Sequence, residues 1–122
     1  MNMIEVQSYQ RQLIVAARDT LMNIAGVCGV SALSLTADRS LTENLGYRHA
    51  EFLALSKYQC RVGNRLRRDG LNTMIDSSEL HPLQVWQVYS LTVLRATGTT
   101  FDQGDAETLI ALGLDELQGG AP

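Results

Sequence analysis

The chain has 122 residues, of which 45% are hydrophobic and 19% are charged, and its formal net charge is −3. This length fits one domain, this composition is typical of folded proteins, and the acidic balance argues against unspecific nucleic-acid binding by the whole molecule. The chain contains two prolines, which leaves room for long helices. We therefore predict a single all-α domain over residues 1–122, a compact bundle of four to five helices with a frayed tail at 118–122.

Residues 4–28 carry the pattern of a long N-terminal amphipathic helix. The apolar positions recur at three- and four-residue steps, and most charged residues fall on the other side. These apolar residues are Val6, Tyr9, Leu13, Ala17, Leu21, Ile24 and Cys28. Gly26 and Gly29 are expected to end the helix, and residues 31–39 to form a connector. Such a helix leaves apolar area for self-association or for docking to a larger assembly.

A second helix is expected to begin near Leu41. Ser40 and Glu43 match a capping box, in which the serine oxygen accepts an amide and the glutamate reaches back. The helix would run to Gly70, with a buried seam at Leu45, Phe52, Leu55, Tyr58 and Val62. Gly46 would cost about 1 kcal/mol in its interior, so either the helix tolerates this glycine or the chain turns there.

The second half predicts two further helices. Residues 71–81 are polar and rich in turn formers, and Pro82 suits the first turn of a helix. Residues 83–96 are apolar nearly all round, which is typical of the central, most buried helix. After a loop at 97–104, residues 105–118 form the last predicted helix, with a break at Gly113 as an option. Its acidic residues lie toward its start, where the helix dipole favours them.

Several kinds of site have no motif in this chain. The two cysteines, Cys28 and Cys60, are isolated, and His49 and His81 lack the ligand spacing of a metal site. Phosphate-binding glycine loops and nucleophile elbows are also missing from the sequence. We therefore expect no enzyme, no cofactor, no metal and no small-molecule substrate. The cysteines are interpreted as reduced cytoplasmic thiols, the histidines as surface or capping residues, and no leader or membrane span is expected.

The most informative pattern is a row of cations at spacings of four, four and three, formed by Lys57, Arg61, Arg65 and Arg68. On a helix these residues are neighbours on one face, and like charges there repel one another. An anion that offsets the repulsion could come from the chain's own acidic C-terminal helix, from an acidic partner protein or from a nucleic acid. We predict a non-enzymatic cytoplasmic interaction protein: an adaptor, a chaperone-like factor or a small subunit of a larger assembly. The four cations are its partner-binding residues, and the partner is another protein or a further copy of the chain.

Residues 40–55 support an alternative function. Leu41, Leu45, Tyr47, Phe52 and Leu55 occupy apolar positions around a turn glycine, Gly46. This segment resembles the helix-turn-helix of bacterial and phage regulators. The resemblance implies a nucleic-acid-binding regulator whose second helix enters the major groove, with Arg48 and His49 exposed there and Lys57 and Arg61 on phosphates. A single capped helix explains the same residues and is the preferred interpretation.

Overall fold

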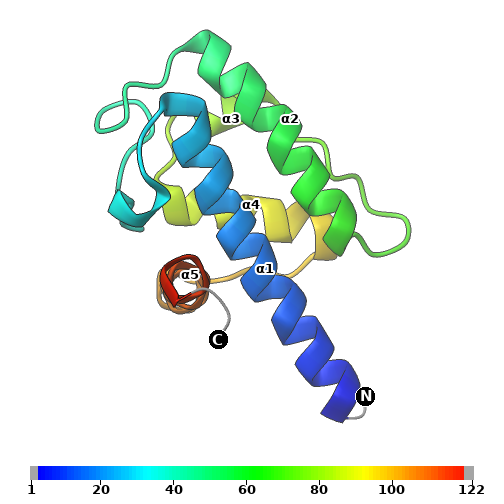
Figure 1. Ribbon diagram of the computed structural model, residues 1–122. Helices are drawn as coiled ribbons and strands as arrows, with labels where there is room; N and C mark the ends of the chain where they lie inside the picture. Colours follow the sequence, from blue (N-terminus) through cyan, green and yellow to red (C-terminus); the bar gives the residue numbers. More distant parts are fainter. Residues whose placement is uncertain (1–2, 120–122) are drawn as a thin grey trace.

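A computed structural model describes residues 3–119, and within this range it contains helices and turns but no strand. The helices are α1 (Met3–Cys28), α2 (His49–Leu66), α3 (Ser77–Leu80), α4 (Val85–Thr97) and α5 (Gln103–Gly119), and a short 3₁₀ turn, η1, spans Ala32–Ser34. The predicted all-α fold is confirmed. Figure 1 shows α1 crossing the molecule, with α2 along one flank of it and α5 on the other.

The long first helix forms as its periodicity predicts. Leu13, Ala17, Leu21 and Ile24 are buried in the core. The helix ends at Cys28 because Gly29 adopts a φ of +76°, a left-handed conformation that favours glycine. Gly26, in contrast, stays inside the helix. None of the helices in the described part of the chain combines the length and apolar character needed to cross a membrane.

The predicted helix start near Leu41 is wrong. Ser40 Oγ does accept the Glu43 amide at 3.1 Å, but the Ser40 amide donates to Asn44 instead of to Glu43. The result is one isolated turn, and Gly46, at a φ of +71°, turns the chain away from helix. Of the two short helices in the helix-turn-helix interpretation of residues 40–55, the first is therefore not formed.

The helix α2 begins at His49 and ends at Leu66, short of the predicted stop at Gly70. Its start is stabilised by Glu51, whose carboxylate accepts the Arg48 amide at 2.8 Å. Arg67, at its end, has an extended ψ of 131°. Arg68 therefore lies beyond the helix, and only three of the four predicted cations belong to α2.

The remaining helices differ from their predictions mainly at their ends. The central helix α4 is largely buried, as expected, but it starts at Val85 because Pro82 lies in the preceding turn. The polar segment before it contains the one-turn helix α3, which was not predicted. The last helix, α5, runs without a break through Gly113 and includes Gln118 and Gly119, the first two residues of the predicted tail. Residues 120–122 lie outside the described range.

A buried glutamine joins three helices at the centre of the molecule. Gln59 of α2 is 0% exposed. Its side-chain nitrogen donates to Thr20 of α1 and Thr92 of α4, both at 3.0 Å, and its oxygen accepts from Asn23 at 2.9 Å. A buried amide is tolerated when all its hydrogen bonds are made, which explains why Gln59 takes the inward position. Its neighbour Tyr58, predicted to be buried, is 41% exposed.

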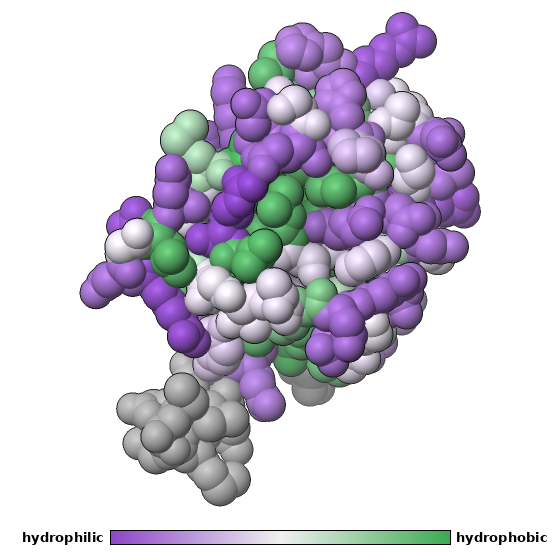
Figure 2. Space-filling model, turned by 180° about the vertical axis from the view of Figure 1, so that it is seen from behind, coloured by the Kyte–Doolittle hydropathy of each residue, from purple (hydrophilic) through white to green (hydrophobic). Residues whose placement is uncertain are grey.

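The face seen in Figure 2 lies on the α4 side of the molecule. Hydrophobic residues gather near its centre, and hydrophilic residues surround them. An ion pair between Arg95 of α4 and Glu79 of α3 holds these two helices together. The Arg95 guanidinium beside Glu79 lowers the pKa of that carboxyl below its ordinary value, so the pair stays charged at neutral pH.

Candidate interaction surface on α1 and α2

The outward face of α2 carries a row of exposed cations. Lys57, Arg61 and Arg65 recur every four residues, and we call these three side chains the basic ridge. Successive members turn by roughly 40° about the helix axis, so the ridge curves gradually from open solvent toward α1. The buried residues Phe52, Leu55, Val62 and Leu66 lie on the opposite side of α2. The helix is therefore amphipathic, with its cations directed away from the core.

The members of the basic ridge differ in how well their charges are compensated. Arg65 lies 3.4 Å from the carboxylate of Asp19 on α1. Arg61 lies over the ring of Tyr58, 5.6 Å from its centroid. Among the side chains of residues 9–119, neither Arg61 nor Lys57 has an ion-pair partner. Two adjacent cations thus face solvent and repel each other, which costs roughly 0.2–0.5 kcal/mol per pair.

The fourth predicted cation, Arg68, has a different environment. Its backbone amide donates to Ala96 of α4 at 2.9 Å, and its guanidinium lies 5.1 Å from the ring centroid of Tyr9 on α1. These contacts direct Arg68 toward the N-terminal half of α1. The structure therefore brings Lys57, Arg61 and Arg65 together on one helix face and places Arg68 separately at its end.

The acidic residues of α5 do not compensate the basic ridge in the same molecule. In the described chain, α5 forms ion pairs through Glu116, which contacts Arg11 and Arg18 of α1. The carboxylate that reaches the basic ridge is Asp19, on α1. Internal pairing with the C-terminal helix was one of the three explanations for the cationic row, and the geometry does not support it.

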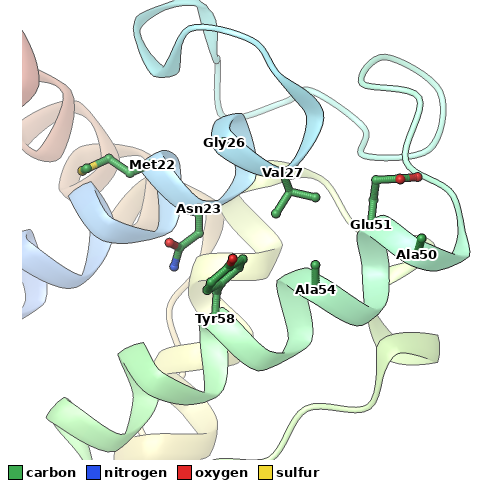
Figure 3. Close-up of a pocket in the computed structure, with 8 residues that line it drawn as sticks. All are labelled: Met22, Asn23, Gly26, Val27, Ala50, Glu51, Ala54 and Tyr58. Carbon is green, nitrogen blue, oxygen red and sulfur yellow. The ribbon is translucent and has the colours of Figure 1, made fainter.

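Next to the basic ridge, an open groove of about 380 Å³ runs between α1 and the first half of α2. We call it the α1–α2 groove. Figure 3 shows Asn23 and Val27 of α1 facing Ala54 and Tyr58 of α2 across it. Its other lining residues are Met22, Gly26, Ala50 and Glu51. The groove exists because glycine and alanine supply little side-chain volume where the two helices face each other.

A buried tyrosine fixes the position of the groove. The Tyr47 hydroxyl donates to the Ile24 carbonyl near the end of α1, at 2.7 Å. Burial raises the pKa of Tyr47 far above its ordinary value, so the hydroxyl keeps its proton and the bond persists. This contact places the chain just before α2 against α1, and Gln59 holds the two helices together further along. The groove lies between these two anchors.

The groove and ridge form one surface through Tyr58. This residue lines the groove and also carries the Arg61 guanidinium on its ring. Met22, 50% exposed, adds an accessible apolar side chain on the α1 side. The sequence pattern identified the cations but missed Met22, Gly26 and Tyr58. The available signal was the short residues of this region: Ala50 and Ala54, four apart on α2, and Gly26 on α1.

The residues of the helix-turn-helix alternative are spread along α2. Arg48 and His49 are exposed at its start, and Arg61 lies twelve residues after His49, which corresponds to about 18 Å along the axis. His81 is exposed at the end of α3, where its ring stacks on Phe52. Among the described side chains, those of residues 9–119, no three histidine, cysteine, aspartate or glutamate residues are grouped to hold a metal ion. Cys28 and Cys60 are both free thiols.

Comparison with known proteins finds no matching family model, no similar curated protein and no significantly similar solved structure.

Proposed function

We propose that this protein is a non-enzymatic cytoplasmic interaction module, which binds an acidic segment of a protein partner on the basic ridge of α2. The main observation in support is that Lys57 and Arg61 are exposed side by side, with no ion pair to any described residue. A carboxylate-bearing partner would relieve their repulsion. Such surface pairs steer and orient a partner more than they tighten binding, so apolar contact must supply part of the affinity.

The α1–α2 groove is suited to that apolar contact. It adjoins the basic ridge through Tyr58, and Met22 and Val27 give it hydrophobic walls. Aromatic and methionine side chains are common at the centre of protein interfaces. The one carboxylate of the groove, Glu51, already accepts the Arg48 amide. These features suit the groove to holding a side chain of a partner protein, and not to transforming a substrate.

A protein partner fits this surface better than nucleic acid does. Phosphate backbones attract extended cationic surfaces. Here Asp19 lies beside Arg65, and Glu51 lines the adjoining groove. The net charge of −3 also opposes long-range attraction of a polyanion. An acidic protein segment, in contrast, can be bound by the few cations that the basic ridge provides.

The test compares two charge-reversed variants with the same change in net charge. Lys57→Glu with Arg61→Glu reverses the basic ridge, whereas Arg39→Glu with Arg48→Glu reverses two exposed cations in the segment before α2. The free energy of unfolding of both variants should lie within about 0.5 kcal/mol of that of the original chain, because surface substitutions have small effects on stability. Affinity capture from the native cell should recover a protein partner with the original chain and with the second variant. The ridge variant should lose it.

Direct binding must then be reproduced with the purified partner, and it should weaken when the acidic segment of that partner is neutralised. Equal recovery by the ridge variant would refute the proposed surface. Binding of a random DNA duplex, with a steep linear fall of log affinity against log salt, would instead assign the ridge to nucleic acid.

A further inference from the structure

The helix α5 presents an acidic face that mirrors the basic ridge. Asp105, Thr108, Leu112 and Asp115 follow one another at spacings of three, four and three, and all four are exposed. We call these residues the acidic ridge. No lysine or arginine occurs anywhere in α5. Residues at these spacings are neighbours on a helix surface, so the two carboxylates and Leu112 share one face.

Part of this acidic ridge is electrostatically unfavourable within its own molecule. Asp105 lies in the first turn of α5, where the helix dipole favours a negative charge. Asp115 lies toward the other end, where the dipole opposes it, and the last turn holds no cation. Its neighbour Glu116 is bound by Arg11 and Arg18, whereas Asp115 pairs with no cation in the range 3–119. Asp115 therefore resembles Lys57 and Arg61 as a charge without a partner.

The two ridges cannot meet in one molecule. The helices α2 and α5 pack on different flanks of α1, as Figure 1 shows. Their outward faces point away from the shared core, since the buried residues of α5 are Ala106, Ile110 and Gly113. Two copies of the chain, in contrast, can bring the acidic ridge of one against the basic ridge of the other.

The dimensions and composition of the ridges also match. Lys57 to Arg65 spans about 12 Å along α2, and Asp105 to Asp115 spans about 15 Å along α5. The acidic ridge includes an exposed leucine, Leu112, which is 41% exposed and lies between the aspartates. The basic ridge is preceded by another, Leu53, which is 42% exposed and lies four residues before Lys57. A contact between the ridges would thus pair opposite charges and bury apolar surface on both sides.

We infer that the acidic segment bound by α2 is the α5 helix of a second copy of this chain. This inference rests on the proposed function, because it names the partner of the same surface. The contact is head to tail, joining different faces of the two copies. A bound pair keeps one free basic ridge on one copy and one free acidic ridge on the other, so association continues into rings or open chains instead of stopping at a symmetric dimer.

Neutralising variants allow a sharp test by sedimentation velocity. One variant, Lys57→Gln with Arg61→Gln, removes charges from the basic ridge; the other, Asp105→Asn with Asp115→Asn, removes them from the acidic ridge. The original chain should form larger species as its concentration rises roughly a hundredfold. These species should dissociate between about 50 mM and about 500 mM salt, because exposed charges are then screened. Each variant alone should be monomeric.

The mixture of the two variants gives the decisive result. The first keeps an intact acidic ridge and the second an intact basic ridge, so together they should form a 1:1 dimer and nothing larger. As a control, neutralising Arg39 and Arg48 to Gln should leave the association of the original chain unchanged. Circular dichroism melts of every variant should overlay, which shows that the fold is retained.

An original chain that stays monomeric at every concentration would overturn this inference. So would self-association that survives neutralisation of either ridge, because another surface would then be responsible. If the chain is monomeric but Lys57→Glu with Arg61→Glu still abolishes capture of a different protein, the proposed function stands and only the identity of the partner is wrong.

Discussion

The two flanks of α1 are built in opposite ways. On the α5 flank, Gly113 brings two helices into backbone contact: a Cβ atom added at Gly113 would lie 2.8 Å from the Arg18 nitrogen. Glu116 of α5 reinforces this contact by pairing with Arg11 and Arg18. This contact is close-packed, and the three charged side chains at it form ion pairs. Its glycine has a clear role in the packing of the molecule.

On the α2 flank, Gly26 has no such role. A Cβ atom added there would meet nothing within 4 Å, and the α1–α2 groove lies beside it. Hydrogen bonds from Gln59 in the middle of α2 and from Tyr47 just before it hold this side of α1, and the groove lies between them. The comparison shows that α1 is closely packed against α5 on one side and borders a groove on the other. The open side is the one that borders the uncompensated cations.

The largest expected effect comes from removing the central anchor of the α2 flank. Gln59→Ala should lower the free energy of unfolding by about 3 kcal/mol, because hydrogen bonds to Thr20, Thr92 and Asn23 are lost and a cavity remains. Gln59→Leu keeps most of the volume but leaves the three partners unsatisfied, and it should lower the free energy of unfolding by about 2 kcal/mol. Urea unfolding measures both. Equal stability of the Leu variant and the original chain would mean that packing alone joins α1 to α2.

The next largest effect tests the close packing of α5 against α1. Gly113→Ala should lower the free energy of unfolding by about 1–2 kcal/mol, since the added methyl group forces α5 away from α1. This loss would occur although alanine is intrinsically the better helix former by about 1 kcal/mol. Thermal unfolding followed by circular dichroism is a suitable measurement. A variant more stable than the original chain would show that the α5 flank is looser than its geometry indicates.

The parts of the fold that follow from local periodicity were predictable from sequence. The apolar spacing in α1 and the nearly uniform hydrophobicity of α4 each identify a helix that the structure contains. The start of α2 was not predictable in this way. The capping pattern at Ser40 forms only a turn, and contacts distant in sequence, such as Tyr47 with Ile24, decide where the helix begins.

The candidate site was predictable in part for the same reason. Helical spacing brings Lys57, Arg61 and Arg65 onto one face, as the pattern indicates. Periodicity could not show that Gln59 is buried and Tyr58 exposed, because a hydrogen-bond network across three helices decides this pair. Nor could it show that Arg65 meets Asp19, since that contact depends on how α1 packs against α2.

The smallest expected change in stability tests the α2 flank most sharply, because here the free energy of unfolding should rise, whereas in the other variants it should fall. Gly26→Ala should raise the free energy of unfolding by about 0.5–1 kcal/mol, since alanine favours helix and its methyl group meets no neighbour in this chain. The same methyl group projects at the α1–α2 groove, so partner affinity should fall while stability rises. Unfolding and binding measured on one preparation separate the two effects, with Gly113→Ala as the matched glycine substitution. A loss of stability in Gly26→Ala would show that α1 is closely packed on both flanks.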